Sequence, residues 1–116
     1  MNAEEFINMI KLVVVKASIE AMGETMDKPA GRNPAQDLLE LSGWYKQLND
    51  ENKTMVLKVI KESVEMSVFG FLCVLDGVTA IENEEMKGTL SLHYEKNNTR
   101  ELINHPDKEY LHNLFR

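Results

Sequence analysis

The chain has 116 residues, of which 43% are hydrophobic and 28% are charged, values that exclude a disordered chain. This length has room for a single domain, residues 1–116, with one core that needs no disulfide or metal. Nineteen acidic side chains against thirteen Lys and Arg give a net charge of −6, and no segment is locally basic, so DNA and RNA binding are not expected.

Neither secretion nor membrane insertion is expected from the sequence. The N-terminal residues include Glu4 and Glu5, whereas a secretory signal peptide starts with basic residues. The most hydrophobic run, residues 66–75, is about half as long as a bilayer-spanning helix. The single cysteine, Cys73, lies in this apolar run and is predicted to pack in the core, because a nucleophilic thiolate needs basic, partly exposed surroundings. We therefore expect a soluble cytoplasmic protein.

The first predicted helix covers residues 3–26. Asn2 and Glu5 have the spacing of a capping box at its start. Apolar side chains recur every three or four residues, which places them on one helix face, namely Phe6, Ile10, Val13, Ala17 and Ala21.

A loop rich in Pro and Gly follows, and a second helix is predicted from Pro34 to about Leu48. Trp44 and Tyr45 are neighbours on this helix and cannot both point straight inward. Both residue types are frequent at binding hot spots. We therefore expect one of the two to lie at an edge, where it is a candidate for contact with a partner.

The third predicted helix is the longest and covers residues 50–76, with Asn49 as its cap. Its first half is amphipathic, but its polar face ends after Glu65. Because a helix that is apolar all round is buried all round, residues 66–75 are expected to be enclosed by the other elements. Gly77 is expected to terminate this helix.

The pattern then changes to the alternation of half-buried strands. Residues 78–81 and 89–94 are predicted to pair as a hairpin through the acidic connection 82–88. Asn97 and Asn98 mark a further turn, before a short third strand at residues 100–103. A terminal helix is predicted to open at Pro106. The predicted fold is therefore α+β: three main helices around a central buried helix, a C-terminal β-hairpin or small antiparallel sheet, and a short terminal helix.

Parts of the sequence resemble a small uncharacterised bacterial protein family of unknown function. The resemblance is carried by three segments, residues 41–45, 67–78 and 110–115. It implies a compact bacterial cytosolic protein and assigns no activity, substrate or functional residue. Small acidic α+β proteins of this type are often immunity or partner proteins.

No catalytic, cofactor or metal motif is recognisable in the chain. The three histidines, His93, His105 and His112, lack the i, i+3 or i, i+4 spacing of metal ligands and are predicted to be exposed polar residues. Asp76 breaks a local rule, because an acid at a helix C-terminus faces the negative end of the helix dipole. It is interpreted as a turn residue before Gly77, or else as a functional acid at the mouth of the core.

Two hypotheses about function remain open. The first is a non-enzymatic interaction protein of the immunity or partner type, which acts through an acidic or aromatic surface on a protein partner or on a second copy of itself. The alternative is a small enzyme or ligand-binding domain whose pocket lies between the third helix and the hairpin and uses Asp76, His93 or Arg100. No cofactor is expected under either hypothesis.

Overall fold

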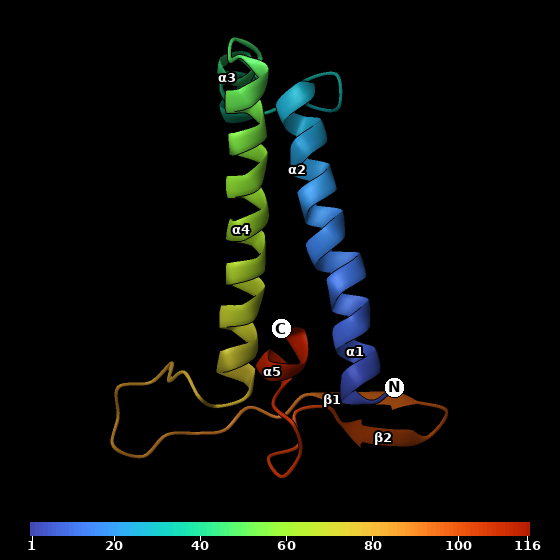
Figure 1. The fold of residues 1–116 in the computed structure, drawn as a ribbon. Coiled ribbons are helices and arrows are strands. Elements are labelled where there is room, and N and C mark those ends of the chain that lie inside the picture. Colours follow the sequence, from blue (N-terminus) through green and yellow to red (C-terminus); the bar gives the residue numbers. More distant parts are fainter.

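Two long helical arms form the frame of the molecule in the computed structural model, which describes residues 1–116 (Figure 1). The first arm is continuous helix: α1 (Ala3–Ile10), the π-helical segment η1 (Lys11–Lys16) and α2 (Ala17–Asp27). The second arm is α4 (Asp50–Leu75), which runs antiparallel to the first. Helix α3 (Gln36–Lys46) lies between the arms in sequence and packs at the end of the frame farthest from the chain termini.

The ends of the two arms follow the capping rules predicted from the sequence. Asn2 Oδ1 accepts the N–H of Glu5 at 2.8 Å, and Asn49 Oδ1 accepts the N–H of Asn52 at the same distance. Caps of this kind stabilise a helix by about 1 kcal/mol each. Gly77 (φ +77°) ends α4 in the left-handed conformation that glycine adopts without strain. Two helices begin later than predicted: α3 at Gln36 rather than Pro34, and the terminal helix at Leu111 rather than Pro106.

The base of the molecule holds the remaining elements. Strands β1 (His93–Lys96) and β2 (Thr99–Leu102) form an antiparallel hairpin, and α5 (Leu111–Phe115) fits between the lower ends of the arms (Figure 1). Four buried side chains form one cluster here, from α1, α4, the residue after β2 and α5: Ile7, Leu72, Ile103 and Leu111. The predicted α+β fold, with a small antiparallel sheet and a short terminal helix, is confirmed.

The predicted pairing of residues 78–81 with 89–94 is wrong, whereas the predicted turn at Asn97 and Asn98 and the short strand after it are confirmed. Residues 78–92 form neither a helix nor a strand, and the hairpin lies instead between the two strands around Asn97 and Asn98. Both asparagines have positive φ (52° and 62°), the backbone of a two-residue hairpin turn that matches the twist of the strands. The connection 82–88 is longer than the two-residue loop that favours hairpins and lacks its turn residues.

The expected enclosure of residues 66–75 is only partly realised. Leu72 and Cys73 are buried, as predicted for the cysteine, but Met66 and Phe71 are 72% and 62% exposed. Only 10 of the 116 residues are buried, and they lie mainly in two groups, at the base and near α3. The apolar half of α4 is therefore covered on one side only.

The molecule is extended for its length. Its radius of gyration is 18.3 Å, against about 13 Å for a compact domain of the same number of residues. It exposes 8803 Å² of surface, whereas a compact monomer of its mass exposes about 6,500 Å². Roughly 2,300 Å² more surface thus meets solvent than its size requires. None of the helices combines the length and apolar character needed to cross a bilayer.

Candidate functional site

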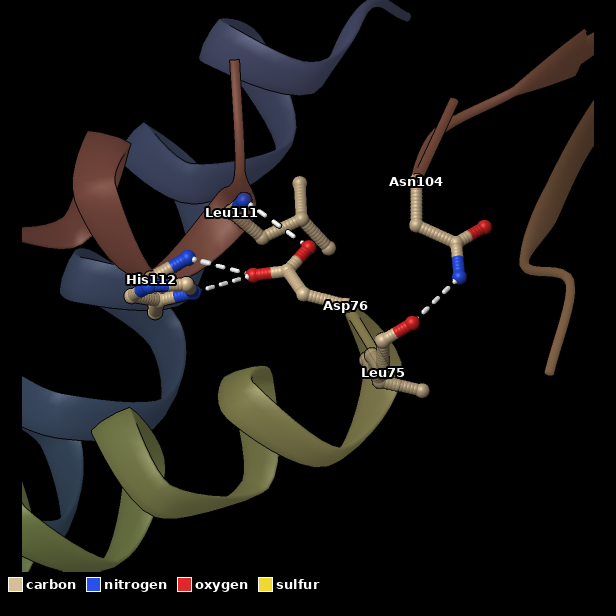
Figure 2. A network of polar contacts seen from close by, with 5 residues as sticks. All are labelled: Leu75, Asp76, Asn104, Leu111 and His112. Atoms are coloured by element: carbon tan, nitrogen blue, oxygen red, sulfur yellow. Dashed lines mark hydrogen bonds and ion pairs between the residues drawn. The ribbon is translucent and has the colours of Figure 1, made fainter. Parts of the chain in front are cut away.

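Asp76 joins the end of α4 to the start of α5 (Figure 2). Its carboxylate accepts the backbone N–H of Leu111 at 3.0 Å and that of His112 at 2.9 Å. The residue that precedes α5, Tyr110, makes no side-chain cap of its own. Asp76 therefore caps α5 from 35 residues away in the sequence.

The same carboxylate pairs with the imidazole of His112. The Nδ1 atom lies 2.6 Å from Asp76 Oδ2, and the Asp76 side chain is only 2% exposed. Because an ionised carboxylate only accepts, His112 donates from Nδ1. The ring stacks on Tyr110 (centroids 5.2 Å apart) and meets the edge of Phe69 (5.6 Å). His112 is thus 14% exposed, and its predicted exposure is wrong.

Asn104 makes a second polar link at the same place. Its Nδ2 donates to the carbonyl of Leu75 at 2.7 Å, the contact drawn in Figure 2, and to that of Leu90 at 2.8 Å. Its Oδ1 accepts the N–H of Leu92 at 2.8 Å. Asn104, which follows β2, therefore connects the end of α4 with residues 90–92, which precede β1.

A pocket opens beside this junction, between the end of α4 and the loop that replaces the predicted first hairpin. Its volume is about 370 Å³, within the range of small-molecule sites, and it is lined by the end of α4 and the loop of residues 79–91. Asp76 and Asn104 belong to its wall, but their polar atoms are already bonded within the chain. The charged side chains left on its wall are Lys87 and Glu82, both from the loop, and the Glu82 carboxylate accepts the Gly88 N–H at 3.3 Å.

His93 and Arg100 lie on the hairpin, outside this pocket. The guanidinium of Arg100 contacts Nδ1 of His93 at 3.3 Å and pairs with the Glu95 carboxylate at 3.1 Å. Both side chains of the ion pair are more than 60% exposed, so solvent weakens their attraction to at most about 1 kcal/mol. These three residues form one face of the hairpin, apart from Asp76.

Trp44 and Tyr45 are placed as their adjacency predicts. Tyr45 is 8% exposed and packs near α2, and the ammonium of Lys53 lies 5.6 Å from its ring. Its neighbour Ser42 donates to the carbonyl of Met26 at 2.8 Å, which ties α3 to the end of α2. Trp44 is 52% exposed. It is thus the aromatic residue that remains accessible to a partner.

The five candidate residues therefore occupy three separate places and do not converge. The aromatic pair on α3 and Asp76 are separated by the length of α4, whose 26 residues span about 39 Å. No group of three or more His, Cys, Asp or Glu side chains is arranged to hold a metal ion.

The most extensive unexplained feature is an apolar surface along both arms. On the first arm it comprises Met9, Leu12 and Val13, which are 41%, 51% and 56% exposed. On α4 it comprises Met55, Val59 and Met66, which are 53%, 62% and 72% exposed. We call these six residues the apolar stripe. Their spacing was visible in the sequence, but the extended shape that exposes them was not.

Comparison of the chain with protein-family models, with curated proteins and with solved structures finds no match.

Proposed function

We propose that this chain is a non-enzymatic interaction protein of the bacterial cytoplasm, which binds another protein chain through the apolar stripe. The observation that carries this proposal is the exposure of six large apolar side chains in line along two helices. Several exposed apolar side chains that recur along one helix mark interaction sites on proteins, whereas single exposed apolar residues need no explanation.

The polar junction at the base supports a structural rather than a chemical role for the buried acid. Asp76 uses both carboxylate oxygens on groups of α5, and its side chain is almost inaccessible. Acid–base catalysis needs a group that reaches a bound substrate. The exposed ring of Trp44 offers a further contact to a partner at the far end of the arms, and the net charge of −6 favours a basic partner.

The test is affinity capture with a matched pair of variants. Val59→Glu places a charge in the stripe, and Thr54→Glu places the same charge on an exposed polar position of the same helix. A protein chain retained by the wild type and by Thr54→Glu, but lost from Val59→Glu, is the expected result. If all three retain the same set of proteins, the stripe is not a binding surface.

The pocket beside α4 favours a second candidate, the binding of a small molecule. Its volume of about 370 Å³ would hold a ligand of modest size, in contact with Glu82 and Lys87. Under this proposal, a ligand found by thermal-shift screening loses its effect in Lys87→Ala and keeps it in Lys58→Ala, on the far part of α4. An unchanged thermal shift in Lys87→Ala contradicts it.

A further inference from the structure

We infer that the partner of the apolar stripe is a second copy of this chain, and that two copies form an antiparallel four-helix bundle. The inference rests on the proposed function, because it names what covers the stripe. Three properties of the chain point to a second copy: the area left uncovered, the match in side-chain size along the arms, and the placement of charge.

The uncovered area is what a stable dimer needs. Each chain exposes roughly 2,300 Å² more than a compact monomer of its mass. Obligate homodimers bury about 2,000–5,000 Å² in total, or about 1,000–2,500 Å² from each chain. The excess belongs to the whole chain, the exposed residues 78–91 included, and it is large enough to contain an interface of this size.

Two contacts define the axial register of the two arms, that is, which residues of the antiparallel helices lie at the same level. A Cβ built on Gly23 would lie 3.8 Å from Leu57 Cδ2, so residue 23 is level with residue 57. Ile7 and Leu72 belong to one buried cluster at the base. Counting from these two points in opposite directions along antiparallel helices, Ala21 is level with Val59, Val13 with Met66, and Met9 with Gly70.

This register places a large side chain level with a small residue at two of its three levels, and Val13 level with Met66 at the third. In the proposed dimer a two-fold axis runs parallel to the arms, so that the first arm of one copy lies beside α4 of the other. Rotation about this axis does not shift residues along it, so the register within one chain also holds between the two copies. Met9 then faces Gly70, and Val59 faces Ala21, which is also exposed in the single chain. Alternation of large and small residues lets neighbouring helices interdigitate, and every neighbouring pair in this bundle is antiparallel.

The charges beside the stripe also complement each other. Lys16 lies at the end of η1, within one helical turn of the level of Glu62. Neither side chain takes part in an ion pair within the chain. In the bundle they approach each other across the interface, where opposite charges favour this pairing over others.

Size-exclusion chromatography with light scattering tests the assembly. The wild type should have twice the chain mass of 13.3 kDa. Val59→Glu and Met66→Glu should weaken the dimer at least about 100-fold, because each interface then buries unpaired carboxylates. Thr54→Glu should remain dimeric. Circular dichroism checks that each variant is helical, and Met66→Ser, with about 10-fold weakening expected, replaces any Glu variant that unfolds.

Cross-linking tests the arrangement of the copies. In a Cys73→Ser background, a chain with Ala21→Cys mixed with a chain with Val59→Cys should form a disulfide-linked pair. The pair Ala21→Cys and Thr54→Cys should not. A dimer without the first cross-link, or one that both Glu variants leave intact, overturns the bundle. A monomeric wild type that still captures a different protein through the stripe overturns the second copy as partner and leaves the proposed function standing.

Discussion

Replacement of Asp76 by alanine removes the link between α4 and α5, and its cost follows from three hydrogen bonds. The carboxylate accepts the backbone N–H groups of Leu111 and His112 and the Nδ1–H of His112. Loss of a helix cap or of a buried neutral hydrogen bond costs about 1 kcal/mol, and loss of a bond to a charged group costs about 2 kcal/mol. The sum is about 4 kcal/mol of unfolding free energy.

For a domain of this size, 1 kcal/mol lowers the Tm by roughly 3–5 °C, so Asp76→Ala should lower it by about 15 °C. Asp76→Asn should lower the Tm by about half as much. Its amide oxygen can still accept one of the three N–H groups, but its NH₂ group is a donor and cannot accept the others. Glu84→Ala, in the exposed loop, is the control and should leave the Tm unchanged.

Thermal unfolding followed by circular dichroism at one fixed protein concentration measures all three variants, since an oligomer's Tm depends on concentration. A shift of less than about 4 °C for Asp76→Ala would refute the reasoning. Asp76 would then be only the turn residue before Gly77.

Two matched pairs of substitutions extend this test to the other end of the molecule and to the helix termini. In urea unfolding, Tyr45→Ala should lower the free energy of unfolding by about 3 kcal/mol and Trp44→Ala by less than about 1 kcal/mol. The reason is that Tyr45 is 8% exposed and Trp44 is 52% exposed. Equal losses in the two variants would contradict the burial of Tyr45. Gly77→Ala should destabilise by about 1 kcal/mol because of its positive φ, whereas Gly43→Ala should stabilise by about 0.5–1 kcal/mol within α3. An added Cβ would have no atom within 4 Å at either glycine, so steric contact does not distinguish the two variants. Stability changes of the same sign in both would therefore show that the backbone conformation does not determine the effect.

The helices could be predicted because their signals are local. Asn2 and Asn49 cap their helices through residues three positions away, and Gly77 ends α4 through bonds from its own neighbours: Val78 N–H reaches Cys73 O and Gly77 N–H reaches Val74 O. The alternation at residues 78–81 predicts a strand that does not form, whereas the Asn97-Asn98 turn and the strand after it are predicted correctly. The positive φ of Asn97 and Asn98 decides the pairing.

The junction could not be predicted, because its partners are distant in the sequence. Asp76 and His112 are 36 residues apart, and Asn104 lies 29 residues from Leu75. The sequence did show the anomaly, an acid at the negative end of a helix dipole. Its resolution is three-dimensional: the first N–H groups of α5 lie beside the same carboxylate and compensate for the unfavourable end of α4.

The junction also connects the buried acid to the exposed stripe. Leu111, the first residue of α5, is fully buried in the cluster that includes Ile7 of α1 and Leu72 of α4 (Figure 1). Because α5 lies between the lower ends of both arms and Asp76 caps it there, the spacing of the arms at the base depends on this contact. The spacing in turn sets how far the two halves of the apolar stripe stand apart. The buried Asp–His pair thus holds the lower ends of both arms through α5.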